Sequence, residues 1–213
     1  MFSKRDNLEI YQNLDFSVER GYHQVKILEI LRNNLPKFSE DFVNVPVTSL
    51  NQNTNFENYI SQELSFFLNN RENGYIFGFQ AIGPDILVRQ FGAGVHGPTL
   101  FLIEAKRLPT PKRSNDYVKT GIGRFKKEEH GKQYSVAAML GYVQENDFDH
   151  WYGEVNSWII ALISDKGENP RWTMEDQICK IQITDIGEYK SIHSRITERP
   201  ITLHHFWINL CNN

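Results

Sequence analysis

The stretch Thr99-Leu100-Phe101-Leu102-Ile103-Glu104-Ala105-Lys106 decides the fold that we expect for this chain. Its apolar run predicts a buried strand near the centre of a β-sheet. Successive side chains of a strand point to opposite faces of the sheet, so Glu104 and Lys106 project together while Ala105 points into packing on the other face. The strand therefore ends with a carboxylate and an ammonium side by side.

A second carboxylate precedes this strand. Gly83-Pro84 is turn chemistry that leads into Asp85 and the short strand after it, and a glycine-rich loop then returns the chain to Thr99. Mg2+ takes oxygen ligands and usually relies on one or two carboxylates together with phosphate oxygens of the substrate. Asp85 and Glu104 can supply these carboxylates. The Lys106 ammonium can orient or deprotonate an attacking water, or meet the charge that develops on a phosphate being cut.

Pro84-Asp85 followed by Glu104-Ala105-Lys106 resembles the motif of the PD-(D/E)XK nuclease superfamily, which includes many restriction endonucleases and DNA-repair nucleases. The resemblance covers about residues 55 to 165 and rests on this motif and on the order of the expected elements. It implies an α/β, restriction-endonuclease-like fold, with a central mixed β-sheet flanked by helices in the core order α-β-β-β-α-β. It also implies that Asp85, Glu104 and the backbone carbonyl of Ala105 hold Mg2+, for which Mn2+ can substitute, and that Lys106 acts on the water.

The helix expected after Asn55 carries a further candidate. Thr54-Asn55-Phe56-Glu57 has the pattern of a capping box, which gives Glu57 a structural role. Glu63 falls within the apolar arc of this helix. Because the resembled superfamily often places an acid on the helix before the first core strand, we expect Glu63 to complete a second metal site or to order its waters. A rim position, from which Glu63 reaches solvent or a lysine, is the open alternative. The apolar arc consists of Phe56, Ile60, Leu64 and Phe67.

The second core helix is expected over residues 131–143, with Gln133 near its start. Several members of the resembled superfamily place a glutamine or lysine there in contact with the site, so Gln133 is a catalytic candidate, with Lys132 as its competitor. A plain surface glutamine is the alternative. Residues 158–163, Trp-Ile-Ile-Ala-Leu-Ile, predict the buried strand that closes the core order.

The chain divides into three regions within the length of one domain. Residues 1–50 are expected to form an N-terminal helical extension, with a helix from about Ser17 that ends before Pro36. Residues 51–165 form the nuclease core, and residues 166–213 a β extension of the same domain. Strands are expected over residues 75–82, 85–91, 99–106, 178–183, 189–196 and 201–210.

Charge and cysteine content narrow the class of protein. The net charge of −3 excludes a chain that is basic throughout, and two cysteines are too few for a disulfide framework or a zinc site. From Lys106 to Lys127, however, eight Lys or Arg accompany a single acid, Asp116. This basic stretch suits contact with a phosphate backbone, with a solvated loop as the alternative. Besides Lys106, its members are Arg107, Lys112, Arg113, Lys119, Arg124, Lys126 and Lys127.

Together these features predict a Mg2+-dependent endonuclease that hydrolyses phosphodiester bonds, with double-stranded DNA as the expected substrate and RNA left open. A non-catalytic nucleic-acid- or protein-binding module on the same fold is the main alternative, and a hydrolase for another phosphoester is a third. A homodimer is compatible with cutting both strands. No stretch approaches the roughly 20 apolar residues of a membrane helix, and no signal peptide is evident, so we expect a cytoplasmic protein without a membrane partner.

Overall fold

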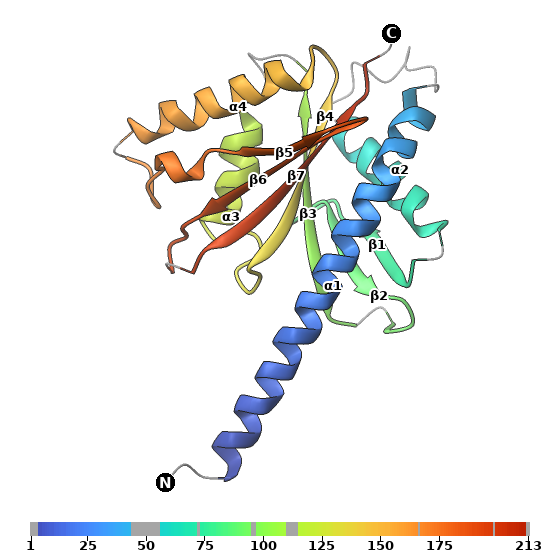
Figure 1. Cartoon of the computed structure of the whole chain (residues 1–213), viewed down its shortest axis with the longest axis vertical. Helices are drawn as coiled ribbons and strands as arrows, with labels where there is room; N and C mark the ends of the chain where they lie inside the picture. The colour runs from blue at the N-terminus through green and yellow to red at the C-terminus, as the bar shows by residue number, and fades with distance from the viewer. Residues whose placement is uncertain are drawn as a thin grey trace.

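A computed structural model of the chain describes residues 4–43, 56–71, 73–94, 97–109, 115–165, 167–197 and 199–211, with side chains from residue 20 onward. Its centre is a seven-stranded mixed sheet in the order β1-β2-β3-β4-β7-β6-β5 (Figure 1). Strands β3, β4 and β7 run parallel, and the remaining neighbours are antiparallel. The strands are β1 (Tyr75–Phe79), β2 (Ile86–Gln90), β3 (Thr99–Leu108), β4 (Val136–Val143), β5 (Cys179–Ile183), β6 (Ile186–His193) and β7 (Ile201–Asn209).

Helices cover both faces of this sheet, which makes the protein α/β with three layers (Figure 1). One hydrophobic cluster joins α1 and α2 to one face, and a second joins η2, α3 and α4 to the other. In the described part of the chain, no helix has both the length and the apolar character needed to cross a membrane. The helical elements are α1 (Lys4–Val43), α2 (Phe56–Asn69), the π-helix η2 (Tyr117–Ile122), α3 (Gly123–Lys126), α4 (Phe148–Ile163) and the short η3 (Met174–Asp176).

Strand β3 has the two-faced character expected of it. Phe101, Ile103 and Ala105 are buried in the cluster under α1 and α2, whereas Leu102 and Leu108 belong to the cluster under α4. The strand is hydrogen-bonded to β2 on one side and to β4 on the other, so it is internal to the sheet. The expected strands around β1, β2, β5, β6 and β7 are likewise confirmed, as is the buried stripe of α2.

The helix expected over residues 131–143 is wrong, because Val136–Val143 forms strand β4. Seven of its eight residues are buried, since parallel neighbours lie on both sides of it and helices cover both of its faces. A strand buried on both faces reads as a continuous apolar run, which periodicity alone does not distinguish from a buried helix. Alanine, methionine and leucine within the run then favour the helical reading.

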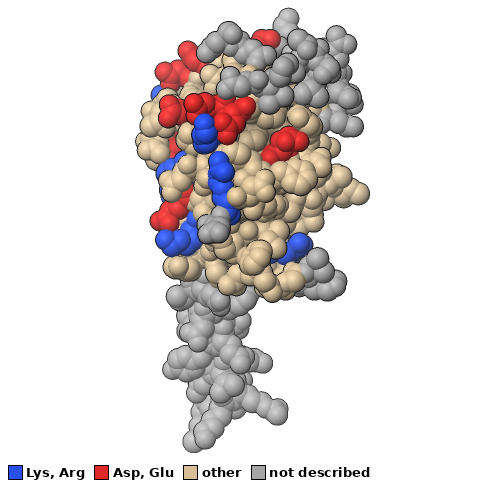
Figure 2. All heavy atoms as spheres, turned by 90° about the vertical axis from the view of Figure 1, so that its right-hand side faces the viewer, with Lys and Arg blue, Asp and Glu red and all other residues tan. Residues whose placement is uncertain are grey.

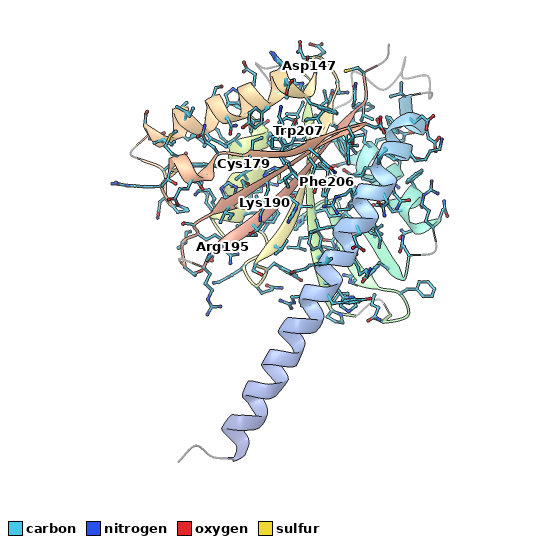
Figure 3. The ribbon with its side chains drawn as sticks, viewed as in Figure 1. Asp147, Cys179, Lys190, Arg195, Phe206 and Trp207 are labelled. Carbon is cyan, nitrogen blue, oxygen red and sulfur yellow. The ribbon has the colours of Figure 1, made fainter. Side chains whose placement is uncertain are left out.

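The strand expected over residues 158–163 is also wrong, because these residues are the last turns of α4. Trp151, Val155, Ile159 and Leu162 are buried at helical spacing, while Ile160 is 46% exposed. Asp147 begins the helix as its N-cap and accepts a hydrogen bond from the His150 N–H at 2.8 Å (Figure 3).

Helix α1 continues to Val43 through Pro36, where we expected it to end. Proline within a helix costs about 3 kcal/mol because one backbone hydrogen bond is lost. Leu35, Phe38 and Phe42 are buried in the core on either side of this position. Burying each such side chain contributes about 1.5 to 3 kcal/mol, so their sum outweighs the cost of the proline.

Candidate active site

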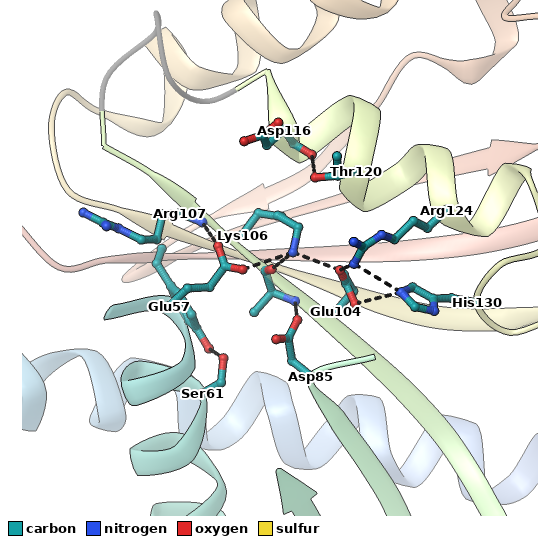
Figure 4. A network of polar contacts seen from close by, with 12 residues as sticks. Glu57, Ser61, Asp85, Glu104, Lys106, Arg107, Asp116, Thr120, Arg124 and His130 are labelled. Atoms are coloured by element: carbon teal, nitrogen blue, oxygen red, sulfur yellow. Dashed lines mark hydrogen bonds and ion pairs between the residues drawn. The ribbon is translucent and has the colours of Figure 1, made fainter. Parts of the chain in front are cut away.

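Strand β3 brings a carboxylate and an ammonium into direct contact. Glu104 and Lys106 are 1% and 8% exposed, and Lys106 Nζ lies 2.9 Å from Glu104 Oε1 (Figure 4). Both side chains leave the same face of the strand, as alternation requires, and the Ala105 side chain between them is buried in the opposite cluster. The predicted pairing of Glu104 with Lys106 is therefore present in the structure.

Asp85 joins this pair from the turn before β2. Its Oδ2 accepts a hydrogen bond from the Ala105 N–H at 2.7 Å, which ties the turn to the middle of the motif (Figure 4). Burial, reinforced by the nearby charge of Glu104, raises the pKa of Asp85 to about 7. Two carboxylates thus share a site in which each disfavours the ionisation of the other.

Glu104 has one satisfied carboxylate oxygen and one unsatisfied one. Oε1 receives Lys106 Nζ and Arg124 Nη1, the latter at 3.2 Å. Oε2 is buried without a hydrogen-bond partner, and the nearest titratable atom recorded for it is His130 Nε2 at 3.6 Å. Burial raises the pKa of Glu104, although the ammonium of Lys106 opposes this effect. A buried carboxylate oxygen is ordinarily hydrogen-bonded, so Glu104 Oε2 is available to a bound water or cation.

The Lys106 ammonium is surrounded by oxygens from three residues. It donates to the Ala105 carbonyl at 2.7 Å and to Glu57 Oε1 at 3.1 Å, in addition to its contact with Glu104 (Figure 4). Burial alone lowers the pKa of an ammonium, but the carboxylates around Lys106 outweigh burial and raise its pKa. Lys106 is therefore held in its charged form.

Glu57, rather than Glu63, is the acid that α2 directs toward this site. Besides its contact with Lys106, Glu57 accepts the Arg107 N–H at Oε2 over 2.9 Å. At about 100° per residue, Glu63 lies some 120° around the helix from Glu57, and no hydrogen bond or ion pair joins its described side chain to the site. We assigned Glu57 to a capping box with Thr54, which lies outside the described residues. A capping role gives no information about the side of α2 on which Glu57 lies, which is the side that faces Lys106.

Arg124 and His130 complete the polar surroundings of Glu104, and sequence reasoning missed both as residues of the site. Arg124, on α3, also approaches His130 Nε2 at 3.4 Å (Figure 4). Burial, together with the charge of Arg124, lowers the pKa of His130, so its imidazole is neutral. The Arg124 side chain is 39% exposed and can therefore reach a ligand in solvent.

Gln133 lies in the loop before β4, not on a helix. Its side chain is exposed, and within the described residues no hydrogen bond connects that side chain to the site. Its backbone carbonyl accepts a hydrogen bond from Arg20 Nη1 at 3.1 Å. Its predicted role depended on a position near the start of a helix, and the structure has no helix at this point of the described chain.

The basic stretch does not form one surface. Lys119 and Lys127 are exposed, whereas Lys126 is 1% exposed and donates to Asp176 at 2.7 Å, so its ammonium is not available to a phosphate. Arg107 is half-buried, and its Nε donates to Gln144 at 2.8 Å. Lys112 and Arg113 lie outside the described residues.

The site supplies three carboxylates, those of Asp85, Glu104 and Glu57, and the Ala105 carbonyl within one small region. The nitrogen groups of Lys106, Arg124 and His130 lie next to them. Within the described ranges, no three side chains of His, Cys, Asp or Glu are grouped as a metal site. Comparison with protein-family models, with curated proteins and with solved structures finds no match to this chain. Any function must therefore be argued from the site itself.

Proposed function

We propose that this protein is a Mg2+-dependent endonuclease that hydrolyses phosphodiester bonds of DNA. The observation that carries the proposal is Glu104 Oε2, a buried carboxylate oxygen without a partner, beside a second buried carboxylate, Asp85. Two such groups repel each other and raise each other's pKa unless a cation lies between them. A divalent cation bound between Asp85 and Glu104 would compensate their negative charges and so stabilise both ionised carboxylates in this buried position.

The order of elements supports a restriction-endonuclease-like core. Helix α2, the antiparallel strands β1, β2 and β3, a helical crossover and the parallel strand β4 follow one another in the order that the resemblance implies. The crossover is η2 with α3, so the second helix and the last strand of the core come earlier in the chain than we expected. The candidate site lies on the third strand of this unit, where the motif places it.

The donor set fits a hard cation. Asp85, Glu104 and the Ala105 carbonyl supply oxygens only, which is the chemistry that Mg2+ prefers, and water and substrate oxygens ordinarily complete such a site. When bound, the ion supplies a Lewis acid for the phosphoryl oxygen and lowers the pKa of an attacking water. Two of the proposed oxygen ligands, Glu104 Oε1 and the Ala105 carbonyl, are held by the Lys106 ammonium in this structure.

The raised pKa of Lys106 favours one of the two roles considered for it. Because its pKa is raised, the amine stays protonated and is a poor general base at neutral pH. We infer that Lys106 acts through its charge, by orienting a water or by stabilising the negative charge of the transition state. Arg124, half-exposed beside Glu104, would contact the same phosphate with its guanidinium.

Three exposed basic side chains support an approach of the nucleic acid from the crossover side of the molecule. Arg124, Lys119 and Lys127 all belong to the crossover and the turn after it. On the face seen in Figure 2, acidic side chains gather near the upper end, and the described Lys and Arg side chains are scattered, several of them beside acidic ones. A phosphate backbone would therefore approach the crossover rather than this face.

Cleavage of plasmid DNA by the wild-type protein and by Glu104→Gln tests the proposal, with Mg2+, with Mn2+ and with chelator. Glutamine keeps the shape of the side chain and removes its charge, and Glu63→Gln serves as the matched control on α2. We expect metal-dependent nicking or linearisation that is lost in Glu104→Gln and retained in Glu63→Gln. Salt-sensitive DNA binding without cleavage by any of the three proteins would favour the non-catalytic binding module instead.

A further inference from the structure

A continuous chain of buried polar side chains crosses the molecule on the α4 side of the sheet, away from the candidate site. We call it the buried relay. Each of its side chains is at most 3% exposed, and each is hydrogen-bonded to the next. Its members, in order, are Lys126, Asp176, His193, Ser191, His205 and Tyr117, and the indole of Trp207 donates to the Tyr117 hydroxyl from outside this series.

The first part of the relay is centred on Asp176 of η3. Asp176 Oδ1 accepts from Lys126 Nζ at 2.7 Å and lies 2.7 Å from His193 Nδ1. Its other oxygen, Oδ2, accepts the backbone N–H of Thr173 at 2.7 Å. Burial alone would raise the pKa of this carboxyl, but the hydrogen bonds from His193 and Lys126 lower it. Asp176 is thus a fully satisfied, ionised acceptor.

The second part runs along β6 and β7 and returns to the crossover. Ser191 Oγ lies 2.6 Å from His193 Nε2 and 2.7 Å from His205 Nε2. His205 Nδ1 lies 2.8 Å from the hydroxyl of Tyr117, which also accepts the indole N–H of Trp207 at 2.9 Å. Tyr117 begins η2 and Lys126 ends α3, so both ends of the relay belong to one segment.

Ser191, His193 and Asp176 have the hydrogen-bond order of a catalytic triad, but they are not placed to act as one. The Ser191 hydroxyl is 3% exposed and is held between two imidazoles. A nucleophile must reach its substrate, and a second histidine on the same hydroxyl has no place in the triad arrangement. The group is therefore part of the framework.

One arrangement of protons satisfies every bond of the relay. Asp176 only accepts, so His193 donates from Nδ1, and because burial lowers its pKa and keeps the ring neutral, its Nε2 accepts from the Ser191 hydroxyl. With its proton used, Ser191 accepts from His205 Nε2–H. The Tyr117 oxygen already receives an N–H, so its own proton goes to His205 Nδ1. Both histidines are then neutral, in opposite tautomers, and burial accordingly lowers the pKa of each.

We propose that the buried relay is a positioning device for the candidate site: it fixes the crossover segment, residues 115–130, against the sheet and so holds the guanidinium of Arg124 on Glu104. Arg124 and Lys126 lie in the same short helix, so anchoring Lys126 to Asp176 fixes the backbone from which Arg124 extends. The catalytic meaning of this placement rests on the proposed nuclease function, but the placement itself does not.

The close fit of the crossover to the site shows why its position matters. A Cβ atom at Gly121 would lie 2.5 Å from Met139 Cε and 3.4 Å from Lys106 Cγ. The backbone of the segment therefore packs directly on the stem of Lys106, as well as presenting Arg124. A small displacement of the crossover would disturb both cationic side chains of the site.

Nitrogen NMR of the histidine rings tests the proton arrangement in the full chain, without metal or DNA. Imidazole 15N shifts and their couplings distinguish the tautomers, and His193→Gln and His205→Gln assign the signals. We expect His193 protonated at Nδ1 and His205 protonated at Nε2, both neutral at pH 7. The reverse tautomers, or an imidazolium at either position, would overturn the relay as we describe it.

Hydrogen–deuterium exchange tests the positioning. Ser191→Ala interrupts the relay at its midpoint, and Ser39→Ala, which removes a buried hydroxyl that donates to the Asn209 carbonyl at 2.6 Å on the opposite face of the sheet, is the matched control. We expect exchange in residues 115–130 to rise on the order of tenfold in Ser191→Ala alone, as the loss of a buried hydrogen bond allows, with β1 and β2 unchanged. Tyr117→Phe, at one end of the relay, carries the same test if Ser191→Ala does not fold.

Cleavage assays then connect placement to function. In a double-mutant cycle, Ser191→Ala should cost less in the Arg124→Ala background than in the wild type, because part of its effect passes through the same guanidinium. Protection of the crossover that is unchanged or changes equally across the whole sheet in Ser191→Ala would overturn the positioning role. A crossover that loosens as expected in a protein without nuclease activity would uphold the relay and refute the proposed function.

Discussion

Lys106 Nζ contacts Glu104 Oε1 at 2.9 Å and, in the same position, donates to the carbonyl of the residue between them at 2.7 Å. The ammonium thus holds two oxygens that a divalent cation would need. Binding of Mg2+ would require Lys106 to move from these oxygens toward the water or the phosphate. The residue that makes these two contacts is thus the same one that we propose to act in the reaction.

Replacing Lys106 with methionine separates these two roles. We expect a loss of cleavage of about 10² to 10³-fold, the usual effect of removing one group that stabilises transition-state charge. Without metal, the variant should also be less stable by about 3 to 5 kcal/mol, because buried carboxylates lose their cation. Mg2+ should restore part of that stability. Urea unfolding with and without Mg2+ measures this, with the exposed Lys119→Met as control, and unaltered cleavage by Lys106→Met would refute the role.

Asp85→Asn should change how stability depends on pH. The pKa of Asp85 is about 7 in the folded protein, against an ordinary value of 3.8, so the folded state holds its proton longer than the unfolded chain. Stability is therefore lost as pH rises from about 4 through 7. Asparagine carries no such penalty, so we expect the variant in chelator to be more stable than the wild type by about 3 to 4 kcal/mol at pH 8, since one pKa unit corresponds to about 1.4 kcal/mol. At pH 4 the two proteins should be nearly equal in stability.

Thermal unfolding across this pH range, in the presence of chelator, measures the effect. Glu63→Gln provides the matched control, because it removes a half-buried acid on α2 that does not contact the site. Parallel curves for the wild type and Asp85→Asn would contradict the raised pKa of Asp85.

Glu57→Gln and Glu63→Gln together decide which acid of α2 belongs to the site. Glu57 holds both the Lys106 ammonium and the Arg107 N–H, so its loss should reduce cleavage about 10- to 100-fold, as removal of a supporting group around a metal site does. Glu63→Gln should cleave at the wild-type rate. Initial rates at saturating Mg2+ make the comparison, and the opposite ranking would return the role to Glu63.

The salt dependence of DNA binding separates exposed cations from the buried one. Lys119→Ala and Lys127→Ala should each lower the slope of log K against log salt concentration by about 1, for one lost phosphate contact. Lys126→Met should leave the slope unchanged but should destabilise the protein by about 3 to 5 kcal/mol, because Asp176 loses its buried partner. A reduced slope for a folded Lys126→Met protein would show that this lysine does reach the DNA.

The residues near the motif were predictable because short-range pattern fixes them. The apolar run of β3 and the alternation of its faces place Glu104 and Lys106 together, and the Gly83-Pro84 turn delivers Asp85 beside them. The segment of β4 was predicted to be a helix and the end of α4 to be a strand. In a continuous apolar run, the spacing of apolar residues does not distinguish a helix from a strand.

Contacts between distant segments were not predictable in the same way. Glu57 reaches Lys106 across 49 residues of sequence, and Lys126 reaches Asp176 across 50. In the sequence, Lys126 belongs to a basic stretch, but in the structure it is buried. Glu57 has the position of a helix cap in the sequence, but the packing of α2 against β3 brings it to Lys106. Only the tertiary arrangement distinguishes a charged side chain that faces solvent from one that is buried with a partner.

The position of a bound Mn2+ ion in crystals of the protein tests the central claim most directly. The anomalous signal of manganese locates the ion without reference to activity. We predict a single strong peak bonded to Glu104 and Asp85, with the Lys106 ammonium displaced from Glu104 Oε1, and no such peak in Glu104→Gln. Absence of a peak there in wild-type crystals at a Mn2+ concentration that supports cleavage, or a peak bound only by other residues, would contradict the account.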